Sequence, residues 1–260
     1  MPSRTNWARM RNWLLTLLTF NFAFLTIQCG LDIEDPTPPS PPVWVQKSSP
    51  EEWPERGIDA HESGAIYLEW EPGGEDNIIV YSIYRAQYYE ADDSLGNYEM
   101  IGRLDVDGNI SLSYIDSDAD INTEYYYSLK AEDQSGNRSG ASDSLGFSLL
   151  HQIKIATMLP NGLEDTLSID RNFSWYASWI LEMEDYCLTI ANLNGTLIYR
   201  EVFSPGNYEN RSHSKRIPQS VYFESGMVYK WRIDTGARYV MGLESAASES
   251  LWATFVYTGE

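Results

Sequence analysis

The sequence predicts an all-β protein in which two tandem β-sandwiches follow an N-terminal signal peptide. Residues 123–133 carry large apolar side chains at every second position, and only an extended backbone turns alternate residues to one face. Residues 226–234 repeat this alternation, with Tyr229 standing 104 positions after Tyr125. The inward side chains are Tyr125, Tyr127, Leu129 and Ala131 in the first stretch and Tyr229, Trp231 and Ile233 in the second. The recurrence indicates a duplicated domain.

The spacing of aromatic residues upstream of these stretches supports the duplication. Trp70 precedes Tyr81 by 11 residues, and Trp175 precedes Tyr186 by 11 residues. The tryptophan also precedes the tyrosine of the alternating stretch by 55 residues in the first copy and by 54 in the second. Three anchors matched over so long a span are hard to obtain by chance, so we expect the two halves to share one strand order.

Length and charge limit the possible functions. The chain has 260 residues, enough for two domains of ordinary size, and 13% aromatic residues can fill two cores. Its 18 Lys and Arg residues stand against 38 Asp and Glu residues, which gives a net charge of -20. Because nucleic-acid binding needs clustered basic side chains to neutralise phosphates, we expect no nucleic-acid partner.

Residues 1–28 have the composition of an export signal. They contain Arg4, Arg9 and Arg11, no acidic residue, and a largely apolar run over residues 13–27. This order is typical of a secretory signal peptide. The run is shorter than the roughly 18 to 20 apolar residues of a comfortable membrane span, so a cleaved signal is expected and an uncleaved anchor is the alternative.

Cys29 follows the apolar run directly. The sequence LTIQCG at residues 25–30 resembles the lipobox of bacterial lipoproteins. The resemblance implies that residues 1–28 are a lipoprotein signal peptide and that Cys29 carries a lipid that anchors the protein to a membrane. It also implies an extracytoplasmic location at the outer membrane or cell surface of a bacterium. A cysteine that merely follows the signal is the alternative.

Residues 29–42 are acidic and rich in proline, a composition that resists helix and sheet and stays extended. We therefore expect a stalk between Cys29 and the first domain. Once Cys29 carries a lipid, Cys187 is the only other cysteine, so no disulfide framework is expected. Alternation turns Cys187 to the opposite face from its neighbours, where we expect an inert strand thiol and no nucleophile.

Residues 43–150 are predicted to form the first sandwich. Turn sequences rich in Gly, Asn and Pro divide this region into short apolar segments without a helical period. The predicted strands are residues 43–45, 65–70, 79–86, 98–104, 113–116, 123–133 and 139–148. Seven short strands are typical of an immunoglobulin-like β-sandwich.

The first domain resembles a fibronectin type III domain. The resemblance rests on Trp70, on YSIYR at residues 81–85, on the pattern TEYxYxLxA at residues 123–131 and on DxSGNxS at residues 133–139. It implies that Tyr125 is the tyrosine corner of that family, with a buried ring and a hydroxyl bonded to the backbone of the preceding turn. Residues 51–64 are longer than the usual first connection of the family.

Residues 151–260 are predicted to form a second, divergent fibronectin type III-like domain. The pattern GxxYxWR at residues 226–232 carries the resemblance. The predicted strands are residues 153–158, 172–175, 185–190, 196–202, 215–218, 227–234 and 250–257. The linker at residues 149–152 is short and lacks Pro and Gly, so we expect a semi-rigid connection.

The sequence contains no pattern typical of a catalytic or metal site. His61, His151 and His213 stand in unlike contexts, without a nucleophile elbow, zinc-ligand spacing or phosphate loop, so we expect neither an enzyme nor a cofactor. The run DSDAD at residues 116–120 could turn alternate carboxylates toward a calcium ion. It lacks the later Gly and Glu of an EF-hand loop, so a solvated turn is favoured and no metal site is predicted.

The expected function is a non-enzymatic structural or protein-interaction module of the cell envelope, with an envelope protein or a glycan as partner. The alternatives are a cell-surface adhesin or glycan-binding protein, or an accessory module of an envelope enzyme system. A binding site on a sandwich requires exposed apolar side chains that the core does not explain.

The alternation of inward and outward side chains predicts such a surface on the first domain. If Tyr81 and Tyr125 point inward, then Tyr84 and Tyr126 point outward and are expected to stand side by side, because their strands are neighbours in a type III sandwich. Tyr88 and Tyr89 follow just beyond the strand end. These four tyrosines are the candidate binding patch. Ordinary cross-strand aromatic pairing is the alternative to a stacking platform for a glycan or a docking patch for a protein.

Overall fold

The computed structural model describes residues 36–46, 56–74, 77–106, 112–167, 169–178, 185–204, 211–240 and 243–259. Cys29, the predicted signal peptide and residues 29–35 of the predicted stalk lie outside the described residues, and residues 36–42 form no helix or strand. Within the described part of the chain no helix has the length and apolar character needed to cross a membrane. Its helical elements are two short 3-10 turns, η1 (Glu90–Asp92) and η2 (Ile155–Thr157).

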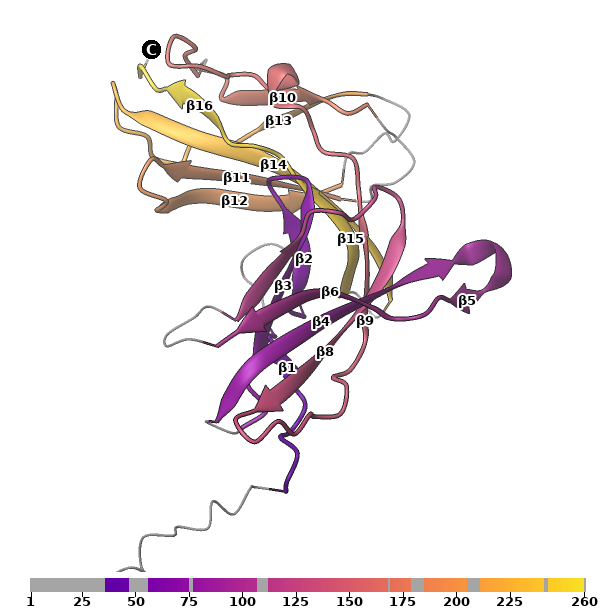
Figure 1. The fold of residues 1–260 in the computed structure, drawn as a ribbon. Helices are drawn as coiled ribbons and strands as arrows, with labels where there is room; N and C mark the ends of the chain where they lie inside the picture. The colour runs from indigo at the N-terminus through magenta and orange to yellow at the C-terminus, as the bar shows by residue number, and fades with distance from the viewer. Residues whose placement is uncertain are drawn as a thin grey trace, which may run out of the picture. The chain divides into compact units, whose positions relative to one another are not determined.

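The first half of the chain folds into a β-sandwich of two antiparallel sheets (Figure 1). One sheet contains β1 (Val43–Trp44), β2 (Ile58–His61), β3 (Ala65–Glu71) and β7 (Ser113–Asp116). In the other sheet the strands lie in the order β6 (Glu99–Asp105), β4 (Ile78–Tyr89), β8 (Glu124–Asp133) and β9 (Leu145–Leu149). The end of β4 also forms a hairpin with β5 (Ser94–Leu95), which Figure 1 shows beyond the other strands of this sheet.

The second half repeats this arrangement. A two-stranded sheet pairs β10 (Asn172–Tyr176) with β13 (Ser212–Arg216). The facing sheet contains, in order, β12 (Leu197–Phe203), β11 (Asp185–Asn192), β14 (Val228–Val240) and β16 (Ala253–Val256). The far half of β14 also pairs with β15 (Leu243–Glu249). The prediction of two tandem sandwiches of the fibronectin type III or immunoglobulin-like class is therefore confirmed at the level of the fold.

Each sandwich has its own hydrophobic core among the described residues, and the same aromatic pair lies in both. Trp70 packs edge-on against Tyr81 at 5.7 Å between ring centroids, and Trp175 packs edge-on against Tyr186 at 5.1 Å. All four rings are buried, at 2% relative exposure or less. The equal spacing of these residues in the sequence thus corresponds to an equal contact in the fold.

The predicted tyrosine corner is present in both sandwiches. The Tyr125 hydroxyl accepts a hydrogen bond from the backbone N–H of Asp120 at 3.5 Å, and the Tyr229 hydroxyl accepts one from the N–H of Glu224 at 2.8 Å. Each donor stands five residues before its tyrosine. The ring therefore anchors the turn that leads into β8 or β14, and this anchor fixes where the outward residues of those strands lie.

β1 and β2 both pair with β3 in the first sandwich. Val45 donates its N–H to the Glu69 carbonyl at 3.2 Å, and Glu69 donates its own N–H to the Gly57 carbonyl at 2.9 Å. Glu69 of β3 is therefore bonded both to Val45, just after β1, and to Gly57, just before β2. Gly57 has φ 77, and a Cβ there would lie 2.4 Å from the Glu69 carbonyl oxygen, so only glycine fits this position. Of the predicted long first connection, residues 51–55 lie outside the described residues, and Ile58–His61 form β2 where the sequence predicts no strand.

Several strand predictions for the second sandwich need correction. Residues 153–158 contain the 3-10 turn η2 and no strand, because the N–H groups of Thr157 and Met158 bond within the segment to Lys154 and Ile155. This turn lets both Ile153 and Met158 reach the core while Lys154 remains exposed. β13 begins three residues earlier than predicted and ends at Arg216. β14 continues to Val240, and β15 was not predicted.

The hairpin of β14 and β15 also reaches the first sandwich. β15 pairs in parallel with β9, with Ala246 opposite Ser148 and Ala247 opposite Leu149. The N–H of Leu150 donates to the Ala247 carbonyl at 2.8 Å, and Ala247 packs in the first hydrophobic core. The Gln152 side-chain amide donates to the carbonyls of Glu62 and Glu249 at 2.9 and 2.7 Å. These contacts restrain the linker that the sequence predicts to be semi-rigid.

Candidate functional site

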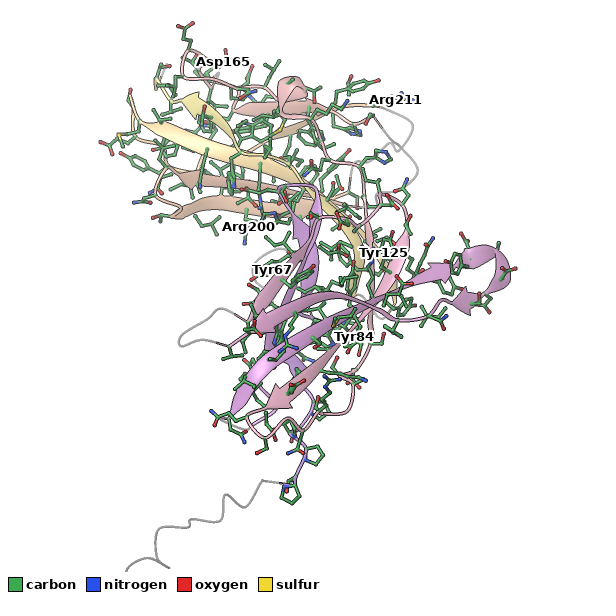
Figure 2. The ribbon with its side chains drawn as sticks, in the orientation of Figure 1. Tyr67, Tyr84, Tyr125, Asp165, Arg200 and Arg211 are labelled. Carbon is green, nitrogen blue, oxygen red and sulfur yellow. The ribbon has the colours of Figure 1, made fainter. Side chains whose placement is uncertain are left out.

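The outer face of the β6–β4–β8–β9 sheet carries most of the predicted tyrosine patch. Tyr81 and Ile83 on β4, like Tyr125 and Tyr127 on β8, are buried in the first core. Alternation therefore turns Tyr84 and Tyr88 on β4, and Tyr126 on β8, to the opposite face. We use the name tyrosine face for the outward side chains Tyr84, Tyr88, Tyr98 and Tyr126. Figure 2 labels Tyr84 in this sheet.

Tyr84 and Tyr126 share this face but are not direct cross-strand neighbours. The register places Tyr84 opposite Ser128 and places Tyr126 opposite Ala86, two residues further along β4. The ring that packs against Tyr126 is Tyr88, at 6.2 Å between centroids and a tilt of 56°. Tyr84 instead lies under the Lys130 ammonium group, 5.5 Å from its ring centroid. The predicted side-by-side pair is thus replaced by Tyr88 and Tyr126, because the sequence alone does not fix the strand register.

Small residues leave room for the Tyr126 ring. Gly146 on β9 stands opposite Tyr126, and a Cβ at this position would lie 2.9 Å from the Tyr126 ring. The same Cβ would lie 3.3 Å from the Glu124 carboxylate. The Tyr126 ring and the Glu124 carboxylate therefore lie together over the bare backbone of Gly146.

Tyr98 belongs to this face although the sequence analysis did not single it out. It stands just before β6, at the edge of the sheet, and its hydroxyl lies 2.5 Å from the Ser144 hydroxyl just before β9. Since β4 and β8 lie between those two strands, the Tyr98 side chain crosses both of them. Ala86 and Ser128 face outward on β4 and β8 and are nevertheless buried, which we attribute to this crossing. The sequence signal that could have identified Tyr98 as part of this face is the presence of an aromatic residue directly before the strand.

Tyr89 does not belong to the tyrosine face. It follows Tyr88 directly within β4, so its side chain points to the other side of the β4–β5 hairpin. A Cβ on Gly96 would lie 3.2 Å from its ring, which places the ring beside the backbone of the returning chain. Tyr89 is 47% exposed, but it forms no part of a surface shared with Tyr126.

The tyrosine face is apolar at its edge as well. Leu95 stands opposite Tyr88 in the hairpin, and Met100 stands opposite Tyr84 on β6. Leu95, Tyr98 and Met100 are exposed at 45%, 39% and 59%. Because none of these side chains belongs to the first core or packs against it, the core does not explain them.

Carboxylates hold two of the hydroxyl groups on this face. The Tyr88 hydroxyl donates to the Asp93 carboxylate at 2.6 Å, and this bond raises the pKa of Tyr88 to about 12. Burial and a hydrogen bond to the Glu124 carboxylate raise the pKa of Tyr126. Both phenols therefore stay protonated at neutral pH and point their hydrogens at local acceptors.

The acidic run at residues 116–120 has structural partners. Asp116 is buried, and its carboxylate accepts hydrogen bonds from the Arg85 guanidinium at 2.7 Å and from the Tyr127 hydroxyl at 2.8 Å. Burial and the neighbouring Asp116 carboxylate raise the pKa of Tyr127. The predicted solvated turn is therefore wrong for Asp116, because inward-facing Arg85 draws its carboxylate toward the core. In the described ranges no group of three or more His, Cys, Asp and Glu side chains is placed to hold a metal ion.

The comparisons with known proteins offer little guidance about this site. No family model and no curated protein matches the sequence. Among solved structures, a myokine is 19% identical over 42% of this chain and 96% of its own, with a TM-score of 0.28. Pectate lyase PelI from Erwinia chrysanthemi is 18% identical over 37% of this chain and 27% of its own, also with a TM-score of 0.28.

The FN1–FN3 domains of chicken CNTN1 match a larger part of the chain. They are 13% identical over 85% of this chain and 67% of their own, with a TM-score of 0.26. TM-scores this low support no conclusion about activity, substrate or partner.

Proposed function

We propose that this chain is a lipid-anchored, extracytoplasmic module of a bacterial cell envelope that binds another protein and catalyses no reaction. The observation that carries the proposal is the tyrosine face, an aromatic surface with an apolar edge that the core does not account for. Exposed aromatic and Met side chains are the residue types enriched at protein interfaces. Isolated exposed apolar residues are common, but here they lie on adjoining strands of one sheet.

The location rests on the N-terminal sequence. The lipobox-like residues 25–30 would supply the lipid at Cys29, and the acidic, proline-rich residues 29–42 would hold the first sandwich away from the membrane. Such a tether confines the tyrosine face to the space near the membrane. Confinement raises the effective concentration of any partner that is fixed in the same envelope.

A glycan is the second candidate for the partner. Exposed tyrosine rings can stack on sugars, and an adhesin would use the same face. The geometry favours it less, because the rings of Tyr88 and Tyr126 are tilted by 56° and do not make one flat platform. An accessory role beside an envelope enzyme would place the same protein-binding surface against that enzyme.

Site-specific photo-crosslinking in a bacterial host tests the proposal. A photoreactive amino acid replaces Met100, which is 59% exposed beside Tyr84, or in a control replaces Tyr222, which is 79% exposed on the second sandwich. We expect a discrete crosslinked protein from position 100 and none from position 222. Equal crosslinking at both positions, or none at position 100, would show that the tyrosine face is not a protein interface.

A further inference from the structure

We propose that the tyrosine face binds the Arg or Lys side chains of a partner protein, and that the pair of Tyr88 and Tyr126 is the site at which the cation lies. This inference rests on the proposed protein-binding function and specifies its chemistry. It follows from three properties of the face: which hydroxyls are already used, how the rings are tilted, and which charges surround them.

The tyrosine hydroxyls are committed to neighbours on the same face. Tyr88 donates to Asp93 at 2.6 Å, Tyr126 is bonded to Glu124, and Tyr98 shares a hydrogen bond with Ser144 at 2.5 Å. A sugar would have to displace these bonds to accept a hydrogen from the Tyr88 or Tyr126 phenol, and could otherwise only donate to the phenol oxygens. The groups still open to a ligand are the ring faces, the phenol oxygens as acceptors and the remaining carboxylate lone pairs, and all of them attract positive charge.

The geometry of the ring pair suits a cation. Tyr88 and Tyr126 lie 6.2 Å apart at a tilt of 56°, so their faces form two walls of an angle. Asp93 and Glu124 hold the outer ends of these rings through the hydroxyl bonds, which places a carboxylate beside each wall. A guanidinium or ammonium group on the open side of this angle would meet the two rings and the two carboxylates.

The chain itself already provides one example of this contact. On the same sheet face, the Lys130 ammonium group lies 5.5 Å from the centroid of the Tyr84 ring. The rings of this surface thus accept a cation in the folded protein. At Tyr88 and Tyr126 the position equivalent to Lys130 would be filled by the partner.

The surrounding charge is complementary to a basic segment. Glu90, Asp92 and Asp93 lie at the tip of the hairpin beside Tyr88, and Glu99 begins β6 next to Tyr98; all four are exposed. The whole chain carries a net charge of -20, which would attract a basic partner over longer range and repel an acidic one.

A pair of synthetic peptides tests the assignment on the full-length protein purified in detergent. The probe is a fluorescent Arg-Gly-Arg-Gly-Arg peptide, and its control has citrulline in place of each arginine, which keeps the shape and removes the charge. We expect the arginine peptide to bind, the citrulline peptide to bind at least about tenfold more weakly, and added salt to weaken the binding of the arginine peptide.

Matched variants locate the site. Tyr126→Leu removes a ring and Glu124→Gln removes a charge with little change of shape, and each should weaken binding of the arginine peptide about tenfold. Two controls lie on the second sandwich: Tyr222→Leu, at a tyrosine 79% exposed, and Asp170→Asn, at an exposed carboxylate that pairs with Arg216. Both control variants should bind as the wild type does.

The outcomes that overturn the inference are distinct from those that overturn the proposed function. Equal binding of both peptides, or equal weakening by the control variants, would show attraction by net charge or stickiness without this site. A specific crosslink from position 100 with no peptide binding would leave a protein interface that does not recognise cations. Retention on cell-wall polysaccharide that Tyr126→Leu abolishes, again without peptide binding, would assign the face to a glycan.

Discussion

The two corner tyrosines differ in the bonds that their hydroxyls make. The hydroxyl of Tyr229 accepts the Glu224 N–H at 2.8 Å, whereas that of Tyr125 accepts the Asp120 N–H at 3.5 Å and donates to the Asp120 carboxylate at 3.3 Å. A bond of 2.8 Å is near the optimum, while one of 3.5 Å is weak. The same sequence position therefore contributes differently to the two copies of the domain.

Replacing the corner hydroxyls should reveal this difference in the free energy of unfolding. Tyr229→Phe leaves the Glu224 N–H without its acceptor and should cost about 1 to 3 kcal/mol, whereas Tyr125→Phe should cost less. Urea unfolding followed by circular dichroism measures both, with Tyr222→Phe at an exposed tyrosine as the control without effect. Unchanged midpoints for both corner variants would mean that these hydroxyl bonds do not stabilise the fold.

Asp133 should make the stability of the protein depend on acid pH. Burial pushes the pKa of Asp133 up, but hydrogen bonds from the Asn137 side chain and from the backbone N–H groups of Asn137, Ser135 and Gly136 outweigh it and lower the pKa. The ionised form is therefore favoured by folding. This contribution is complete above the ordinary Asp pKa of about 3.9 and is lost as the pH falls through the lower pKa of the folded state.

The variant Asp133→Asn isolates that contribution. The wild type should lose more unfolding free energy than the variant when the pH falls from above the ordinary Asp pKa of about 3.9 to below it. Urea unfolding midpoints of both proteins, measured at one pH above the ordinary Asp pKa and one pH below it, give the difference between the two losses. The other carboxylates cancel in that difference because both proteins carry them. An equal loss in the two proteins would contradict the assigned role of Asp133.

At the scale of elements, the sequence predicts the strands in which burial alternates and fails where it does not. β3, β4 and β8 carry large buried side chains at alternate positions, and their existence is confirmed. β11 is also confirmed, because its large apolar side chains alternate in the sequence although its central residues are all buried. β15 has the sequence LESAASE, whose buried residues Ala246, Ala247 and Ser248 are small and consecutive. The burial of Ala246 and Ala247 comes from pairing with β9, a contact about a hundred residues away in the chain that no local pattern records.

The candidate site shows the same limit. Alternation predicts Tyr84 and Tyr126 on the outer face, because a strand has a period of two. Tyr88 is predicted just beyond the strand end, whereas β4 continues to Tyr89 and Tyr88 joins the outer face. The pairing of Tyr126 with Tyr88, however, depends on the register between β4 and β8 and on the missing side chain of Gly146. Tyr98 joins the face through a bond to Ser144 that spans the width of the sheet. Neither the register nor a contact across four strands can be derived from periodicity.

The pairing of β15 with β9 can be tested by a substitution that its close packing excludes. Ala247 is 2% exposed against the first core, so Ala247→Glu would bury a charge and force the two strands apart. Leu150 donates its N–H to the Ala247 carbonyl at 2.8 Å, and its hydrogen exchange should be slow in the wild type and markedly faster in the variant. Leu251→Glu, at a residue 47% exposed, is the control. A Leu150 amide that exchanges rapidly in the wild type would show that the two strands do not pair.

For the whole molecule, duplication and charge act together. Each sandwich has its own core and its own Trp–Tyr pair. Among the buried residues of the first core in the described part of the chain, Ala247 is the one that the second half contributes. The net charge of -20 opposes association between copies and favours basic partners. A protein of this kind would act through surfaces on its sandwiches, and the proposed attachment at Cys29 would decide where it acts.

The lipid anchor is tested by following label and location together. In a bacterial host grown with radiolabelled palmitate, the wild type should be labelled and should sediment with membranes, while Cys29→Ser should be unlabelled and released. More than one acyl chain is needed for stable attachment, since each buried methylene contributes about 0.8 kcal/mol and a single chain binds only marginally. Cys187→Ser is the matched control, because this thiol on β11 is fully buried and should take no lipid. An unlabelled wild type that stays in the membrane together with Cys29→Ser would instead identify residues 13–27 as an uncleaved anchor and would refute the lipoprotein assignment.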